Sequence, residues 1–276
     1  NLSDGLKEFL LLNPSIRRIG FDPEKVTLNT YKKIIKTLGN SFKFKPASLI
    51  SDLRQVKNAD EIEKIKKSCA ISVKVINLIK RIIKPGDWEM AVSDKIKKMF
   101  LEFGAESAFS PIVASSPNSA YPHHISTNKK IPENCHVLID IGAKFRGYCS
   151  DLTRVIFLGK INFIYRRHYD NSIAAQHLSL KAIKPGVKTG EIDKAARSFF
   201  AKSGLKEHFI HSTGHGVGIE VHEKPQLLEG GKEKLSAGMV VTIEPGLYYP
   251  GTGGVRVEDT VLVTENGYEI LTKGVN

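Results

Sequence analysis

The chain has 276 residues, of which 41% are hydrophobic and 25% are charged, and its formal net charge is +12. This composition is typical of a folded globular protein and excludes a disordered or low-complexity chain. The apolar runs are far shorter than the roughly 18 to 20 residues that span a bilayer, and the first residues lack the basic-then-apolar pattern of a secretory signal. We therefore expect a cytoplasmic protein with no membrane partner.

Lysine and arginine outnumber the acids by 41 to 29, which raises nucleic-acid binding as an alternative. The lysines between residues 64 and 98, however, fall on the polar faces of expected helices, alternate with acids and have no interleaved stacking aromatics. A solvated basic face is therefore expected, without nucleic acid as a partner. The three cysteines are odd in number and lack C-x-x-C spacing, so Cys69, Cys135 and Cys149 are predicted to be buried, unpaired thiols.

The first 57 residues read as a partial α/β unit, with a helix over 6–12, a strand over 16–21 and a helix over 30–38. One or two strands are too few for an independent sheet, so we expect this segment to pack on something else. Because the chain begins at Asn1 and is amphipathic at once, we expect a fragment or processed product whose natural amino terminus lies upstream. The expected domains are 1–57 and 58–276.

A long helix is predicted to follow this segment. Asn58, with Glu61 three residues later, forms an Asx version of the capping box. Apolar residues then recur at three-, four- and seven-residue steps as far as Ile83, which predicts an amphipathic helix that stops before a Pro-Gly pair. A second helix is expected to start with Asp87 as its N-cap and to carry an apolar side as far as Phe103.

The sequence from this point is duplicated. Ile-Lys-Pro-Gly occurs at 83–86 and again at 183–186, and the correspondence continues with the pairs Phe100/Phe200 and Gly104/Gly204. The helices of the second copy are expected over 169–183 and from Thr189. Each copy then runs into an apolar strand that ends in an acid and a return strand that holds another. We therefore predict an α+β fold in which a curved antiparallel sheet is backed by helices.

The four acids of these hairpins are Asp140 and Asp151 in the first copy and Glu244 and Glu258 in the second. Acids inside β-branched strands are poor strand formers and costly to bury unless a cation neutralises them. His215, which lies between glycines, adds a nitrogen donor, and the combined set suits Mn²⁺, Co²⁺, Fe²⁺ or Zn²⁺ better than Ca²⁺ or Mg²⁺ alone. Five ligands exceed the needs of one ion, so a dinuclear hydrolytic site is predicted.

Five short motifs, in this order and spacing, resemble the ligand motifs of the pita-bread metallopeptidases across roughly residues 58–272. They are Ile-Asp-Ile-Gly at 139–142, Ser-Asp-Leu-Thr-Arg at 150–154, Gly-His-Gly-Val-Gly at 214–218, Ile-Glu-Pro-Gly at 243–246 and Arg-Val-Glu-Asp at 256–259. The resemblance implies a duplicated pita-bread fold that binds two divalent ions. Mn²⁺ is the expected metal, with Co²⁺, Zn²⁺ and Fe²⁺ as alternatives.

The same resemblance implies a role for each ligand. Asp140 would bind one ion, Asp151 and Glu258 would bridge both ions, and His215 and Glu244 would bind the second. Residues 1–57 resemble the tail of the amino-terminal domain that aminopeptidase P and prolidase carry, as in the Leu-Arg-Gln-Val-Lys sequence that leads into the catalytic domain.

Within the family, residues 118–124, 215–223 and 245–249 resemble the Xaa-Pro group. This resemblance implies an aminopeptidase that removes an amino-terminal residue from peptides with proline second. The alternatives are an Xaa-Pro dipeptidase, which differs only in the permitted substrate length, then a methionine aminopeptidase, and then a catalytically silent peptide-binding pseudoenzyme. Proline-containing peptides are the expected partners, and assembly into a homodimer stays open.

The resemblance also implies catalytic roles around the metals. His123 would face the substrate, His211 would help hold the proline side, and His222 would donate to the scissile carbonyl or its oxyanion. Glu244 would also carry a proton to the leaving proline nitrogen, and Arg256 would orient the two bridging acids.

Two further features receive plainer interpretations. His124 is expected only to solvate its loop. The glycines between 251 and 254 join two strands and open no helix, so a hairpin turn is expected there rather than a phosphate loop.

Overall fold

The computed structural model describes residues 2–275, and the chain divides into two compact units after Arg54. The expected domain boundary lies three residues later, after Lys57. The difference arises because Val56 forms a β-bridge with Met239 and the Lys57 N–H donates to the Gly238 carbonyl at 2.9 Å, so both residues belong to the second unit. That the first segment is part of a larger amino-terminal domain stays a prediction.

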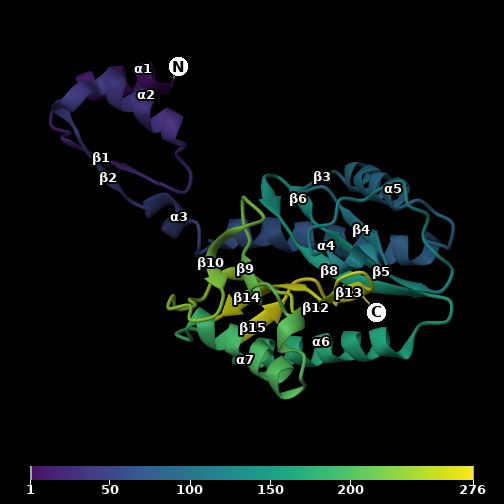
Figure 1. The fold of residues 1–276 in the computed structure, drawn as a ribbon. Helices are drawn as coiled ribbons and strands as arrows, with labels where there is room; N and C mark the ends of the chain where they lie inside the picture. Colours follow the sequence, from purple (N-terminus) through teal and green to yellow (C-terminus); the bar gives the residue numbers. More distant parts are fainter. Residues whose placement is uncertain (1, 276) are drawn as a thin grey trace. The chain divides into compact units, whose positions relative to one another are not determined.

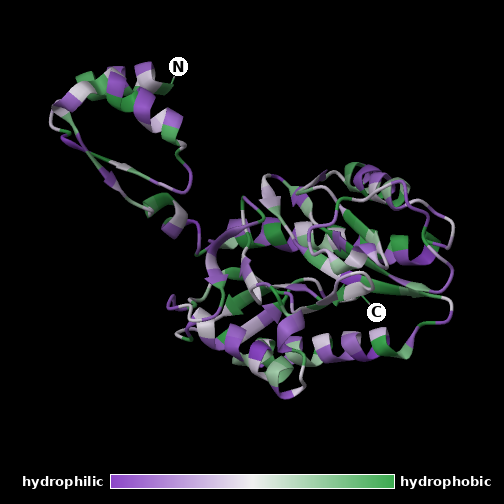
Figure 2. Cartoon of the chain, viewed as in Figure 1, coloured by the Kyte–Doolittle hydropathy of each residue, from purple (hydrophilic) through white to green (hydrophobic). Residues whose placement is uncertain are grey.

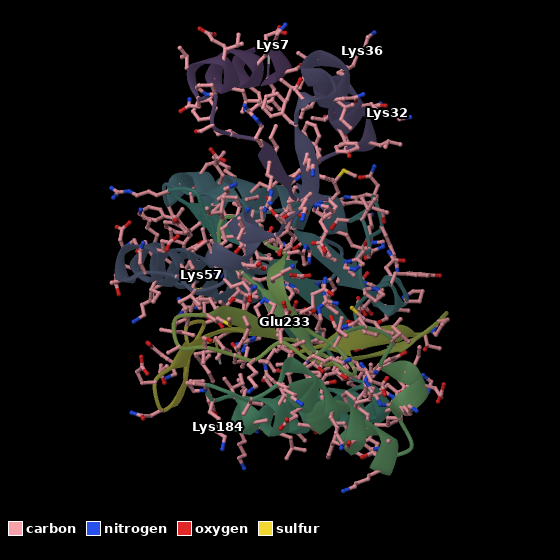
Figure 3. All side chains as sticks on the ribbon, turned by 90° about the vertical axis from the view of Figure 1, so that its left-hand side faces the viewer. Lys7, Lys32, Lys36, Lys57, Lys184 and Glu233 are labelled. Carbon is pink, nitrogen blue, oxygen red and sulfur yellow. The ribbon has the colours of Figure 1, made fainter. Side chains whose placement is uncertain are left out.

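The first unit is a small α/β piece, as expected (Figure 1). Its elements in chain order are α1 (Leu2–Leu12), β1 (Arg18–Phe21), α2 (Leu28–Leu38), the 3₁₀ turn η1 (Gly39–Ser41), β2 (Lys43–Pro46) and α3 (Leu49–Leu53). The strands β1 and β2 pair in parallel, and the Thr27 side chain caps α2 by accepting from the Thr30 N–H. The side chains of Lys7, Lys32 and Lys36 extend outward from these helices (Figure 3).

Four helices form the framework of the second unit: α4 (Ala59–Ile82), α5 (Glu89–Glu102), α6 (Phe163–Ala182) and α7 (Thr189–Lys202). The predicted capping box of α4 is confirmed, because Asn58 Oδ1 accepts from the Glu61 N–H at 3.0 Å and Glu61 Oε2 accepts from the Asn58 N–H at 2.9 Å. The predicted N-cap of α5 is wrong. Trp88 occupies that position, while the Asp87 carboxylate accepts from the Lys84 N–H at 3.1 Å and closes the preceding turn.

The two sequence repeats also share backbone conformation at equivalent glycines. Gly86 and Gly186 have φ values of 87° and 86°, and Gly104 and Gly204 have 72° and 69°. These left-handed conformations favour glycine because it has no side chain to clash. The two copies therefore enter and leave α5 and α7 through the same turns.

All strand pairs between described residues of the second unit are antiparallel, as predicted. In the first half, β4 (Ile112–Ser115), β5 (Cys135–Ile141) and β8 (Leu152–Leu158) form one sheet, and β3 (Glu106–Ser107), β6 (Ala143–Phe145) and β7 (Tyr148–Cys149) form another. The second half has a five-stranded sheet in the order β10 (Glu223–Leu227), β9 (Gly214–Gly216), β11 (Val240–Ile243), β14 (Asp259–Thr264) and β15 (Gly267–Ile270), and the hairpin β12 (Gly246–Tyr249) with β13 (Gly253–Arg256). That hairpin confirms the expected turn at residues 251–254.

The helices cover these strands with apolar side chains. In Figure 1, α5 lies near the top of the unit and α6 and α7 lie at its bottom, with strands between them. Hydrophobic residues concentrate on the central strands and on the helix faces toward them (Figure 2). One core joins Ile96 and Phe100 of α5 to Ile139 of β5, and another joins Ile192 of α7 to Ile243 of β11. Each half therefore fixes its carboxylate strand against its own helices.

Two simpler predictions can be compared with the structure. Cys69, Cys135 and Cys149 are free and buried, as expected, and burial raises the pKa of the Cys135 thiol to about 11. None of the helices formed by residues 2–275 is long and apolar enough to cross a membrane.

Two short 3₁₀ turns, η2 (Asn118–Ala120) and η3 (Lys206–His208), lie in loops of the second unit.

Candidate active site

Strand register places the first two acids on one face. Asp140 of β5 pairs with Thr153 of β8, and Asp151 lies directly before the first residue of β8, two residues from Thr153. Because side chains alternate between the two faces of a strand, Asp151 and Thr153 project to the same side. The β6–β7 hairpin occupies the chain between the two acids.

The second half repeats this arrangement. The last pair between β11 and β14 is Ile243 with Asp259, so Glu244 and Glu258 lie opposite each other one residue beyond it. The β12–β13 hairpin occupies the chain between them. The Glu258 N–H donates to the Thr153 carbonyl at 3.2 Å, which joins the acid-bearing strands of the two halves.

The structure brings Asp151, His215 and Glu258 into one buried group, with a potential ligand atom of each lying within 4.8 Å of the others. His215 Nε2 also lies 3.3 Å from Glu244 Oε1 and 3.7 Å from Asp151 Oδ2. Asp140 Oδ1 is buried without a hydrogen-bond partner. Side chains from both halves thus converge, and a buried carboxylate oxygen is left available for a ligand.

The charges of this group favour a cation. Burial, together with the charges of the neighbouring acids, raises the pKa of Asp151 and of Glu258 well above their usual ranges. Burial lowers the pKa of His215, and its Nδ1 lies 3.1 Å from the Gly216 carbonyl, which leaves Nε2 free to act as a ligand. Carboxylates that repel one another beside a neutral imidazole fit a divalent ion, which supplies the missing positive charge.

Arg256 is the buried cation of the site, and its guanidinium donates to three side chains. It donates to Asp140 Oδ2 at 2.6 Å, to the Tyr248 hydroxyl at 2.7 Å and to Thr153 Oγ1 at 3.1 Å. Thr153 Oγ1 in turn donates to Glu258 Oε2 at 2.6 Å. The expectation that Arg256 orients both bridging acids therefore needs correction, since it contacts Asp140 directly and reaches Glu258 only through Thr153.

His211 belongs to the same network. Its Nε2 lies 3.0 Å from the Tyr248 hydroxyl, and its Nδ1 lies 2.8 Å from the Ser212 carbonyl. Since Tyr248 accepts from Arg256, it can donate its own proton to His211 Nε2, while Nδ1–H donates to Ser212. Burial lowers the pKa of His211, so the ring is neutral with both nitrogens engaged in hydrogen bonds.

His222 and His123 lie near this group. The ring centroids of His222 and His215 are 4.3 Å apart; His222 is exposed as a residue, but partial desolvation, followed by the charge of His215, lowers its pKa. His123 is exposed, and its charge contributes to lowering the pKa of both His211 and His222. The three histidines expected around the substrate are therefore within electrostatic range of one another.

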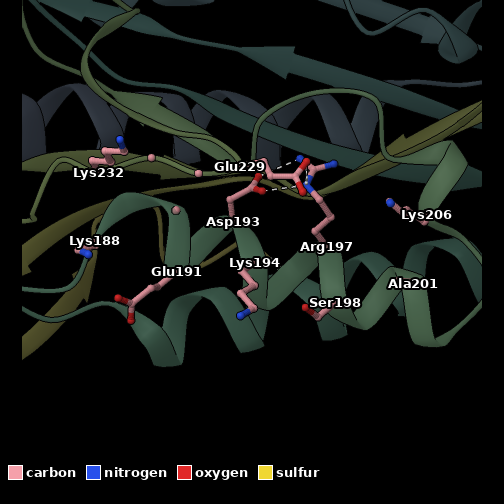
Figure 4. Close-up of a pocket in the computed structure, with 13 residues that line it drawn as sticks. Lys188, Glu191, Asp193, Lys194, Arg197, Ser198, Ala201, Lys206, Glu229 and Lys232 are labelled. Atoms are coloured by element: carbon pink, nitrogen blue, oxygen red, sulfur yellow. Dashed lines mark hydrogen bonds and ion pairs between the residues drawn. The ribbon is translucent and has the colours of Figure 1, made fainter.

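The segment that carries His211 is fixed from behind by α7. Asp193 is fully buried and pairs with Arg197 through two hydrogen bonds of 2.8 and 2.9 Å, while Arg197 also donates to the His211 carbonyl at 3.0 Å. A pocket of about 610 Å³ opens beside this pair, and Figure 4 shows the exposed Glu229 next to the Arg197 guanidinium. None of the five predicted metal ligands lines this pocket.

Thr153, Thr242 and Tyr248 also contribute to the site without having been assigned a role from the sequence. Thr242 accepts from the His215 N–H at 3.0 Å and donates to Glu244 Oε1 at 3.2 Å. A signal for the two threonines exists, because each lies two residues from an acid on a strand and therefore shares its face. The spacing of Tyr248 carries no comparable signal.

His124 also differs from expectation. Instead of only solvating its loop, its Nε2 lies 3.1 Å from Glu89 Oε2, a carboxylate on α5 that is fully buried.

Comparison with known proteins identifies the family. The pattern of metallopeptidase family M24 matches residues 63–265. The chain belongs to metallopeptidase family M24. This confirms the resemblance in the motifs, and binding of divalent metals is a property of the family, whereas the identity of the ion here stays a prediction.

Relatives and solved structures agree with this membership. The chain is 43% identical to the Xaa-Pro dipeptidase of Pyrococcus furiosus over 82% of its own length and 65% of the relative, so it spans about two thirds of that protein. Its fold is similar to that of Xaa-Pro dipeptidase from Bacillus anthracis, with a TM-score of 0.93, 35% identity and coverage of 99% and 77% of the two chains. It is also similar to the fold of X-Pro aminopeptidase from Thermotoga maritima, with a TM-score of 0.88, 34% identity and coverage of 99% of this chain and 78% of the other. The predicted pita-bread fold is thereby confirmed.

Proposed function

We propose that this protein hydrolyses the peptide bond between an amino-terminal residue and a following proline, with Xaa-Pro dipeptides as its preferred substrates. The observation that carries the proposal is the buried group of Asp151, His215 and Glu258 on an M24 scaffold that is 43% identical to a dipeptidase of that specificity. Sequence reasoning had placed the longer-substrate aminopeptidase first and the dipeptidase second. The similarity to named Xaa-Pro dipeptidases favours placing the dipeptidase first.

The residues that would hold the metal are the five predicted ligands, Asp140, Asp151, His215, Glu244 and Glu258. Divalent ions bound there supply a water molecule of lowered pKa and positive charge for the developing oxyanion. Their fit rests on two features of the site, the unpartnered Asp140 Oδ1 and the mutual repulsion of the buried acids.

The protein's own contribution is to orient these groups before the substrate arrives. Arg256 holds Asp140, and Thr153 holds Glu258, each through a hydrogen bond of 2.6 Å. Such short, buried, charge-assisted bonds fix the carboxylates in one orientation. Glu244, which is held by Thr242 at 3.2 Å, is the group assigned to carry a proton to the leaving proline nitrogen.

The histidines act on the substrate. His222 is assigned to donate to the scissile carbonyl as it becomes an oxyanion, a role that its neutral imidazole can fill at neutral pH because its pKa is lowered by burial. His211 and His123 are assigned to the proline side. A surface shaped for a tertiary imide selects against a secondary amide there, since the amide N–H would be buried without a partner.

A second candidate is Xaa-Pro aminopeptidase activity on longer peptides. The similarity to the Thermotoga maritima enzyme, which extends over 99% of this chain, favours it. The two activities differ only in whether the cleft accepts residues beyond the proline.

A panel of four peptides separates the candidates: Ala-Pro, Ala-Pro-Ala, Ala-Ala-Ala and Met-Ala-Ala, each assayed with Mn²⁺. We expect kcat/KM for Ala-Pro to exceed that for Ala-Ala-Ala at least tenfold, corresponding to about 1.4 kcal/mol, and to exceed that for Ala-Pro-Ala. Faster cleavage of the tripeptide Ala-Pro-Ala would assign the aminopeptidase. Equal rates on all four, or preference for Met-Ala-Ala, would reject Xaa-Pro specificity altogether.

A further inference from the structure

Glu89, in the first turn of α5, is a carboxylate with no exposed surface, and the described structure gives it an unusual number of donors. Oε1 accepts from the Ser115 N–H at 2.8 Å, from the Ser115 hydroxyl at 2.7 Å and from Asn118 Nδ2 at 3.1 Å. Oε2 lies 3.0 Å from Asn118 Nδ2, 3.1 Å from His124 Nε2 and 3.1 Å from the Thr127 hydroxyl. All four partners lie between residues 115 and 127.

These partners define one loop. Residues 115–127 leave the end of β4, which pairs with the Asp140-bearing strand β5, and return to the start of α5, where the Met90 N–H donates to the Thr127 carbonyl at 3.1 Å. Ser115 and Asn118 lie near the beginning of this loop, and His124 and Thr127 lie near its end. A single side chain therefore ties the two ends of the loop together.

The middle of the loop is attached to the candidate metal site. Arg256, which binds Asp140, also donates to the Pro122 carbonyl at 3.4 Å, and the Gly254 N–H donates to Ser119 Oγ at 3.0 Å. The next residue after Pro122 is His123, whose imidazole is exposed. His123 thus stands at the tip of a loop that Glu89 fixes at its base and Arg256 fixes at its centre.

The charge of Glu89 agrees with this bonding. Burial by itself would raise the pKa of the carboxyl, but the hydrogen bonds from Ser115, His124 and Asn118 lower the pKa below its usual value. A buried carboxylate is costly unless it is fully hydrogen-bonded, and these donors all come from the loop. The loop and the ionised carboxylate are therefore mutually dependent.

The duplication shows that this contact is not simply part of the repeated scaffold. The residue equivalent to Glu89 in the second copy, 100 positions later, is Thr189, whose buried hydroxyl has no hydrogen-bond partner. In that copy the loop with His211 is instead held by Asp193, which lies one turn further along α7. Each half has thus acquired its own buried carboxylate for its own histidine-bearing segment.

We propose that Glu89 is a positioning residue that holds the 115–127 loop so that His123 meets the substrate. The inference rests on the proposed function in one respect, the role of His123 at the proline side. It assigns no direct contact with substrate or metal to Glu89.

A double-mutant cycle tests the inference. E89Q keeps the size of the side chain but presents an amide to the loop's donors, and H123A removes the imidazole. On Ala-Pro with Mn²⁺, each single variant should lose about tenfold or more in kcat/KM at unchanged metal content. The double variant should lose less than about threefold beyond the worse single variant, since the two residues act as one unit. A loss of kcat/KM in the double variant equal to the product of the two single losses would overturn the proposal.

The control and a second variant keep the test independent of folding. S179A removes a fully buried hydroxyl that bonds the Ile192 carbonyl between α6 and α7 at 3.0 Å. When S179A is combined with H123A, the loss in kcat/KM should equal the product of the two single losses. T127V removes one donor from the loop side without altering α5. T127V should lower kcat/KM about threefold, and this loss should not multiply with the loss caused by H123A. If the two losses do multiply, the result counts against the role of Glu89 even where E89Q does not fold.

Hydrogen exchange provides a readout without catalysis. In E89Q, amides of residues 115–127 should exchange at least tenfold faster than in the parent protein, while those of β11 and β14 stay protected. Unchanged exchange in the loop would overturn the positioning role. If the parent protein fails to cleave Ala-Pro, the proposed function falls, and the exchange result still decides the role of Glu89.

Discussion

Removal of one acid from the buried group should stabilise the metal-free protein. Asp151 is 5% exposed and Glu258 is 2% exposed, and their potential ligand atoms lie within 4.8 Å. Two full negative charges at 4.8 Å repel by about 3.5 kcal/mol at an effective dielectric constant of about 20. Proton uptake relieves part of this repulsion at neutral pH, so D151N should raise the free energy of unfolding by about 1–3 kcal/mol, or Tm by about 2–10 °C.

The pH dependence of this effect has a definite sign. The pKa of Asp151 is raised in the folded protein, so below the pKa of an unfolded Asp, about 3.9, both states are protonated and no penalty exists. As the pH rises above that value, Asp151 ionises in the unfolded chain but stays protonated longer in the folded protein, so the metal-free parent loses stability. The advantage of D151N should therefore be small near pH 4 and should grow toward neutral pH.

Metal should reverse the ranking of the two proteins. At a free Mn²⁺ concentration of about 100 times the Kd, the parent should gain about 2.7 kcal/mol, whereas D151N should gain little because it lacks a bridging ligand. The assay is thermal unfolding with EDTA and with Mn²⁺. D193N is the matched control, since its carboxylate is fully buried but paired with Arg197; it should lose stability and keep the metal shift. A less stable D151N with an intact metal shift would refute the reasoning.

Three further outcomes are expected. H222A should lower kcat by about 10² to 10³, the usual effect of losing one oxyanion donor, at unchanged metal content, and full activity would mark His222 as a packing residue. R256M should leave the Asp140 carboxylate without its ion-pair partner and cost about 3–5 kcal/mol of stability in urea unfolding of the metal-free protein; a loss below about 1 kcal/mol would contradict that pairing. R197M should likewise destabilise by about 3–5 kcal/mol through the buried Asp193 and should also lower kcat/KM, so a stable, fully active variant would remove the proposed link to His211.

The sequence was sufficient to predict that paired strands carry the four acids, because this signal is local, while their role as metal ligands stays a prediction. Asp140 lies on β5 and Asp151 directly precedes its partner β8, while Glu244 directly follows β11 and Glu258 directly precedes its partner β14. The pairing of these strands brings the two acids of each half together. Because the two halves of the chain repeat this pattern, each half supports the prediction made for the other. The helices were also predictable, since apolar periodicity and the Asn58 capping box are features of contiguous residues.

The rest of the site depends on contacts between distant segments. The bond from Arg256 to Asp140 spans 116 residues, and the bonds of Glu89 reach a loop 26 to 38 residues away. Periodicity carries no signal for such contacts, so the direct bond from Arg256 to Asp140 and the contact of His124 with Glu89 could not be predicted. The N-cap error has a different cause: Asp87 has the chemistry of a cap, but its carboxylate bonds the Lys84 N–H in the preceding turn instead.

The central claim is that the two halves of this chain join to form a dinuclear metal site, and the metal content tests it most directly. The protein should be stripped with EDTA, reconstituted with Mn²⁺ or Co²⁺, freed of excess ion and measured by elemental analysis against chain concentration. The five-residue site predicts a value that approaches two ions per chain. A value of one that stays at one in D151A would contradict the shared site.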